Sequence, residues 1–138
     1  MVSFEVVEQS NRPNKKVYSI TDEGHEALQK WTVAPVEPEP SRSELLLKTY
    51  TLWLADPAKA LKLFRAQEDR HRSQLAHYER TLAAIAQEHP APIKVQEPLF
   101  GDYATLQIGE RYEHAYVDWC RWMIAQLEQA TQATGEGL

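Results

Sequence analysis

The sequence has few of the residues and motifs that carry covalent or catalytic chemistry. Its one cysteine, Cys120, excludes an internal disulfide, and its position among aromatic residues of an expected helix predicts a buried, reduced thiol. The 138 residues contain no HExxH pair, no GxSxG turn and no glycine-rich phosphate loop. We therefore expect the protein not to be an enzyme, and we expect no catalytic residues, no cofactor and no metal.

Long apolar runs are also missing. No stretch approaches the roughly 20 apolar residues of a membrane-spanning helix, and the N-terminus lacks the charged-then-apolar pattern of a secretion signal. These absences predict a cytoplasmic protein without a membrane partner. With 43% hydrophobic and 25% charged residues, the composition is that of a chain that folds.

Prolines gather in two segments, TVAPVEPEP at residues 32–40 and HPAPIKVQEPLFG at residues 89–101. Proline disfavours helix and stiffens the chain, so the first segment predicts an extended linker. We place a domain boundary there, with one part at residues 1–31 and a helical domain at residues 41–133.

The helical domain is expected to contain two long helices joined by the second proline-rich segment. Ser41 and Glu44 have the spacing of a capping box, and the apolar segment after them predicts a helix buried on several sides. Asp56 and Pro57 then start a helix, and no further proline or glycine occurs through Glu88. At 1.5 Å per residue, a helix from Pro57 to Glu88 is about 48 Å long. A last helix runs from about residue 103 to 133. Together they form a long antiparallel helical hairpin.

These helices carry more apolar surface than one hairpin can cover. In the first long helix the residues from Leu61 to Ile85 recur in steps of three and four, as in a coiled-coil seam. The last helix has two neighbouring apolar lines. Self-association as a twofold homodimer would bury the surplus. The residues expected at this dimer interface are Leu75, Tyr78, Leu82, Tyr112, Tyr116, Trp119, Trp122, Met123 and Leu127.

Some polar and aromatic residues allow a second interpretation. His71 lies on the seam beside Glu68, where it would set helix register or act as a titrating switch. Glu110 and His114 are four residues apart and could share a metal, but no third ligand is apparent, so a solvent-facing contact is favoured. The aromatic residues could line a pocket for a flat apolar molecule, although core and dimer packing explains them with fewer assumptions.

The N-terminal segment has a different character. Residues 2–9 and 16–20 are rich in β-branched and aromatic residues and flank a polar turn, which predicts a two-stranded hairpin followed by a short helix capped by Thr21. Its tip is basic, although the chain has 15 Lys and Arg against 20 Asp and Glu. Such a finger could contact nucleic-acid phosphates, and a solvated turn is the alternative. The tip residues are Arg12, Asn14, Lys15 and Lys16.

The order of these motifs resembles the PadR-like family of transcriptional regulators. The segment FEVVEQSNRPNKKVYSITDEGHEALQKW is similar to the end of that family's winged-helix domain, with its RPxKKxY-type turn and TxxG helix start. The linker, the RSELLLK helix, the DP-initiated helix and the aromatic last helix follow as in larger members. The resemblance implies a mainly α fold with a wing hairpin, a dimeric regulator, DNA contact through the wing and a small-molecule effector sensed by the C-terminal helices.

The chain departs from the family pattern in one respect. In the family, helices that include the recognition helix precede the wing, whereas this sequence begins inside the expected first strand. One hypothesis is a truncated regulator that binds DNA only in a full-length context. Another is a stand-alone helical interaction module that pairs with itself or a full-length relative and binds a small aromatic ligand. A small ligand-binding protein or enzyme is the third. Under either of the first two hypotheses, tight site-selective DNA binding by these 138 residues alone is not expected.

Overall fold

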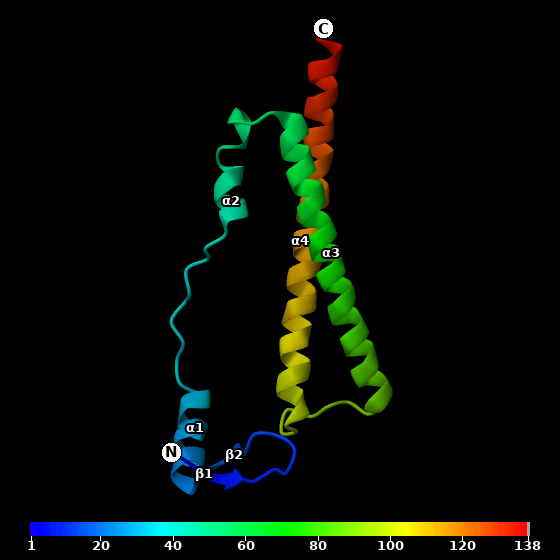
Figure 1. Cartoon of the computed structure of the whole chain (residues 1–138). Coiled ribbons are helices and arrows are strands. Elements are labelled where there is room, and N and C mark those ends of the chain that lie inside the picture. Colours follow the sequence, from blue (N-terminus) through cyan, green and yellow to red (C-terminus); the bar gives the residue numbers. More distant parts are fainter. Residues whose placement is uncertain (138) are drawn as a thin grey trace. The chain divides into compact units, whose positions relative to one another are not determined.

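The computed structural model describes residues 1–137, and it is mainly helical with one two-stranded sheet. This confirms the predicted fold class. The chain separates into two units, one at Met1–Arg42 and one from Ser43 onward. Each unit is described by itself below, and Figure 1 shows the order of the elements along the chain. Within residues 1–137, no helix combines the length and the apolar character needed to cross a membrane.

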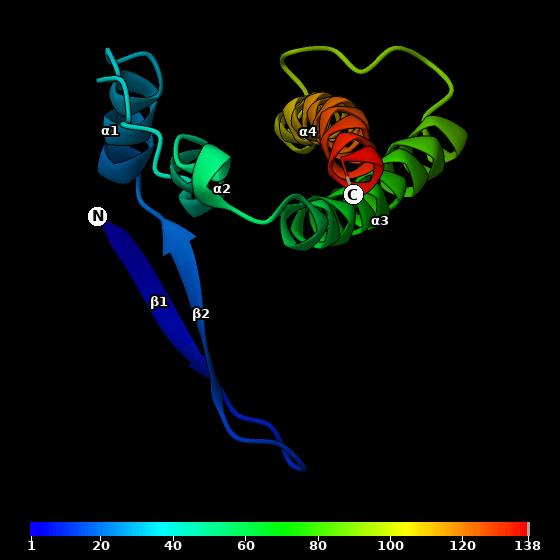
Figure 2. The ribbon, with the colours of Figure 1, turned by 90° about the horizontal axis from the view of Figure 1, so that it is seen from above.

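The first unit begins with the predicted hairpin. Strands β1 (Val2–Val7) and β2 (Lys15–Ile20) pair antiparallel, from Val2 opposite Ile20 to Val7 opposite Lys15. Figure 2 shows them as a long finger that continues into the connecting loop. Because the loop spans residues 8–14, the hairpin has an extended tip and not a tight two-residue turn.

Helix α1 (Asp22–Thr32) follows β2 directly and is capped as predicted by Thr21. The Thr21 hydroxyl accepts a hydrogen bond from the Gly24 amide at 3.1 Å and donates one to the Met1 carbonyl at 3.0 Å. Gly24 is buried, and a Cβ there would lie 2.2 Å from the Met1 carbonyl oxygen. The Thr-x-x-Gly pattern therefore ties the start of β1 to the start of α1. Residues 34–43 then have no regular structure.

At the start of the second unit, the structure differs from the single buried helix that was predicted. Helix α2 (Glu44–Thr49) is short, and a separate 3-10 turn, η1 (Leu52–Leu54), follows it. The cap is Ser43, whose hydroxyl accepts from the Leu46 amide at 3.3 Å, and not Ser41. After α2 the backbone bonds span three residues, which tightens the chain into turns. The exposed apolar side chains of this segment are Leu46, Leu47, Tyr50, Trp53 and Leu54.

Helices α3 (Pro57–Glu88) and α4 (Leu99–Glu136) form the predicted helical hairpin. Both bounds of α3 agree with the prediction, and α4 extends beyond its predicted bounds at both ends. Figure 1 shows the helices side by side over much of α3 and diverging toward the loop at residues 89–98. The Asp56 side chain makes no capping bond, so Pro57 alone carries the predicted start signal.

The core lies where the two helices are closest. Phe64 of α3 and Cys120 of α4 are the largest fully buried side chains, at 1% and 0% exposure. Around them lie Ala60, Leu61, Met123 and Leu127, with Leu45 and Leu52 packed against the cluster. The predicted buried thiol is confirmed, and burial raises the pKa of Cys120, followed by the charge of Glu68 as a second cause. The thiol therefore stays protonated near neutral pH.

Candidate functional sites

The four residues predicted for the wing, Arg12, Asn14, Lys15 and Lys16, all lie on the exposed hairpin of the first unit. Two of the four are held by the hairpin itself. The Asn14 side-chain oxygen accepts from the Gln9 amide at 3.3 Å, and the Lys16 ammonium lies 5.1 Å from the centre of the Phe4 ring. Arg12 and Lys15 have no carboxylate within 4.0 Å among residues 1–137. Their charges are therefore available to an external anion.

The hairpin has one apolar face. Because side chains alternate along a strand, Val2, Phe4 and Val6 share a face with the residues opposite them in β2. The rings of Phe4 and Tyr18 lie 5.4 Å apart, yet both remain more than half exposed. Nothing within the first unit covers this face. It is a surface suited to a protein contact.

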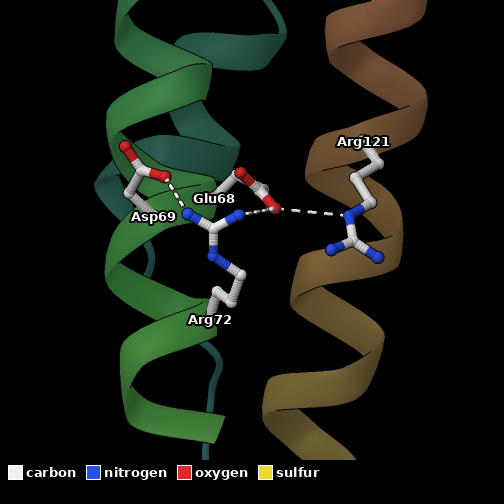
Figure 3. A network of polar contacts seen from close by, with 4 residues as sticks. All are labelled: Glu68, Asp69, Arg72 and Arg121. Atoms are coloured by element: carbon white, nitrogen blue, oxygen red, sulfur yellow. Dashed lines mark hydrogen bonds and ion pairs between the residues drawn. The ribbon is translucent and has the colours of Figure 1, made fainter. Parts of the chain in front are cut away.

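A polar network joins α3 to α4 in the second unit (Figure 3). The Glu68 side chain is only 12% exposed, and its carboxylate lies 3.2 Å from the Arg121 Nε and 3.8 Å from Arg72. Arg72 also reaches Asp69 at 2.7 Å. Glu68 lies on the predicted seam, and its partner on α4 is Arg121. The network fixes the register of the two helices.

His71 instead contacts a buried acid on α4. Its Nδ1 lies 2.5 Å from Glu113 Oε2, within hydrogen-bonding distance. Glu113 is 8% exposed, and the His71 ring stacks on Tyr116 with centroids 4.3 Å apart. Glu113 was not predicted as a functional residue, because the sequence analysis of α4 considered only its aromatic and apolar lines. The signal that could have found it was one charged residue within an otherwise apolar stripe.

This pair forms one wall of a cavity of about 380 Å³. That volume is within the range of small-molecule sites, roughly 300–1,000 Å³. The lining combines aromatic, amide and charged side chains. Desolvation raises the pKa of Tyr112, and its contact with Tyr116 adds to the shift. The lining residues are Ser43, Leu45, Gln67, Arg70, His71, Gln74, Tyr112, Glu113 and Tyr116.

The residues predicted at a dimer interface do not form one surface. Leu75, Met123 and Leu127 are buried within the chain, where α3 and α4 already cover them. Tyr112 and Trp122 are 53% and 57% exposed. The other four are partly buried: Tyr78, Leu82, Tyr116 and Trp119. Exposed apolar side chains lie also on α2 and η1, where sequence reasoning expected burial.

A basic-tipped hairpin, a helix capped by Thr-x-x-Gly and a separate long helical hairpin together define a wing joined to a helical domain. Residues 41–128 match the family model described as "Virulence activator alpha C-term". The chain belongs to this family, and with it to the PadR-like transcriptional regulators, as the sequence resemblance predicts.

Individual relatives agree with this assignment. The chain is 27% identical over 134 residues to the negative transcriptional regulator PadR of Bacillus subtilis, covering 93% of this chain and 70% of the relative. The crystal structure of Bacillus subtilis PadR with operator DNA matches with a TM-score of 0.80 and 25% identity, over 91% of this chain and 70% of that one. The same protein with p-coumaric acid matches with a TM-score of 0.68 and 25% identity, over 89% and 69%.

Proposed function

We propose that the protein regulates transcription in the cytoplasm, with the hairpin as a wing that contacts DNA and the helical unit as the part that dimerises and senses a small molecule. The observation that carries this proposal is the exposed basic tip. Arg12 and Lys15 have no carboxylate within 4.0 Å among the residues that the structure describes, and such side chains contact backbone phosphates in DNA-binding proteins. The relative solved with operator DNA supports this interpretation.

The wing is tested by fluorescence anisotropy with a labelled DNA duplex. Replacing Arg12 and Lys15 by Ala should weaken binding and should flatten its salt dependence, because each lost phosphate contact removes about 0.9 from the slope of log affinity against log salt. The matched control is Lys30→Ala, since Lys30 is an exposed cation that pairs with Glu26 at 2.9 Å on α1. Equal binding by the double variant and the control would remove the tip from the DNA contact.

Dimerisation is proposed through the exposed apolar surface of the second unit. Tyr50 and Trp53 are 83% and 81% exposed, and large exposed apolar side chains of this kind mark protein contacts. Tyr112 and Trp122 add exposed aromatic area from α4, with Tyr78, Leu82, Tyr116 and Trp119 contributing their partly exposed edges. Leu75, Met123 and Leu127 would support this surface from inside the hairpin.

Sedimentation equilibrium tests the dimer. Replacing Trp53 by Glu should shift the wild-type dimer toward monomer, because the charge would have to be buried in the interface. Val95→Glu is the control, since Val95 is 69% exposed in the loop between α3 and α4. A monomeric wild-type chain would contradict the proposal. A stable dimer that lacks DNA affinity even in the full-length context would favour the alternative function, a helical interaction module.

The cavity beside His71 is proposed as the site of a small aromatic effector. Tyr116 and His71 offer stacking faces, and Arg70 can pair with an acidic group. The relative solved with p-coumaric acid supports a ligand of this size. Calorimetric titration with p-coumaric acid should show binding that Arg70→Ala weakens and Arg80→Ala, a control elsewhere on α3, leaves unchanged. Equal affinity in both variants would exclude this cavity.

A further inference from the structure

A second charged cluster joins α3 to α4 outside the cavity described above. It consists of Glu79 on α3 and of Glu110 and His114 on α4. The His114 Nε2 lies 3.5 Å from an oxygen of Glu79 and 3.8 Å from an oxygen of Glu110. One donor atom from each residue lies within 4.8 Å of the other two. The sequence places Glu110 and His114 on one helical face, and the fold supplies Glu79 from the other helix.

The spacing of these atoms is close to that of metal ligands. Zinc binds imidazole nitrogen and carboxylate oxygen at about 2.0–2.2 Å, so neighbouring ligand atoms of a tetrahedral site lie roughly 3.4 Å apart. The observed separations of 3.5 and 3.8 Å exceed this value by a few tenths of an ångström. The side chains are partly exposed, so small rotations about their χ angles would bring all three donors to one ion.

The charges around the cluster also favour a cation. Neither Glu79 nor Glu110 has a Lys or Arg nitrogen within 4.0 Å in the part of the chain described, residues 1–137. Both carboxylates instead face the single imidazole of His114. A divalent ion would offset both negative charges and would use the lone pair of the imidazole nitrogen.

A close helix contact holds the three residues in position. Gly109 precedes Glu110, and Tyr78 precedes Glu79. A Cβ on Gly109 would lie 2.7 Å from the Tyr78 ring, so the ring packs directly on the glycine backbone. This contact fixes the separation of α3 and α4 next to the ligands. The donors therefore come from two helices in direct contact and not from a loop.

We propose that Glu79, Glu110 and His114 bind a divalent transition-metal ion, with zinc the best match to one nitrogen and two carboxylate donors. His114 binds through Nε2, each glutamate supplies one oxygen, and water completes the coordination. The ion would cross-link α3 and α4, and so would stabilise the helical unit in proportion to its occupancy. This site goes beyond the proposed regulatory function and does not depend on it.

The test is a zinc titration of the full chain against a chromophoric chelator. We expect one zinc per chain and a rise in the melting temperature on zinc addition. His114→Ala should weaken zinc binding at least tenfold and abolish the rise, and Glu79→Gln should do the same, because Glu79 is the ligand from α3. All three side chains are at least partly exposed, and circular dichroism checks that the variants fold.

The matched control is His89→Ala, which removes an exposed histidine at the end of α3 and should leave zinc affinity unchanged. Equal affinity in His114→Ala and the wild-type chain would overturn the site and show adventitious binding only. The site would also be overturned if His114→Ala lost zinc binding while Glu79→Gln kept the wild-type affinity, because the ion would then be held by α4 alone.

Discussion

In the first unit, the β-hairpin and α1 are joined through backbone groups of Met1 and Gly24 and the hydroxyl of Thr21. In the second unit, α3 and α4 are joined by side chains that interlock around Phe64 and Cys120. The first unit buries one residue, Gly24, whereas the second buries a cluster of large apolar side chains.

This difference indicates how each unit obtains its stability. An isolated two-stranded hairpin is marginally stable in water, and the apolar face around Phe4 remains open. The first unit therefore depends on hydrogen bonds, one close backbone contact and whatever covers that face. The second unit has its own hydrophobic core, and its stability follows from side-chain packing. Substitutions should therefore destabilise the two units for different reasons.

The largest effect is expected from Phe64→Ala in the core of the second unit. Phe64 is 1% exposed and packs edge-on against Trp119 with ring centroids 5.5 Å apart. Removing it should lower the free energy of unfolding by about 3–5 kcal/mol, because the cavity left behind collapses only in part. Urea unfolding followed by circular dichroism at a fixed protein concentration measures this change.

The control for Phe64 is Val95→Ala, an exposed position whose substitution should change stability by less than about 0.5 kcal/mol. If Phe64→Ala cost no more than Val95→Ala, the second unit would not be held by its core.

A smaller loss is expected when the buried polar pair is broken. Glu113→Ala leaves His71 without its partner in a site where little water reaches it, which should cost roughly 1–3 kcal/mol. Glu128→Ala is the matched control, because Glu128 pairs with Arg65 at 2.9 Å on the surface and such pairs contribute about 0–1 kcal/mol. Equal losses in the two variants would show that His71 and Glu113 do not stabilise the helical hairpin.

The helices and strands follow from local sequence patterns. Thr21 caps α1, Pro57 marks the start of α3, and the alternation of residues 2–7 predicts β1. These features depend on neighbours within a few residues. They were therefore predictable from the sequence, as was the antiparallel pairing of α3 and α4.

Contacts between distant residues were harder to predict. The apolar segment at residues 44–54 was expected to be one buried helix, but only Leu45 and Leu52 pack on the core. Which side of this segment packs on α3 and α4 depends on the path of the chain and not on the hydrophobicity of the segment. The pairing of His71 with Glu113 and the approach of Glu79 to His114 likewise need the interhelical register, which no local pattern fixes.

The smallest of the three effects is expected from Gly24→Ala in the first unit. A Cβ at this position would lie 2.2 Å from the Met1 carbonyl oxygen, so the start of β1 must move away from α1. Overpacking of this kind costs about 1–3 kcal/mol, and the lower part of that range applies because a chain end can shift. Hydrogen exchange should show faster exchange of the Gly24 amide and of the amides in β1 and β2, with no change in α3 or α4.

Gly101→Ala is the matched control, because a Cβ there meets no atom within 4 Å and alanine is the better helix former by roughly 0.5–1 kcal/mol. It should leave exchange in the first unit unchanged and slow it slightly at the start of α4. If Gly24→Ala left the hairpin amides as protected as before, the contact of Met1 with Gly24 would not hold the first unit together. Faster exchange spreading into α3 would instead show that the stability of the two units is linked.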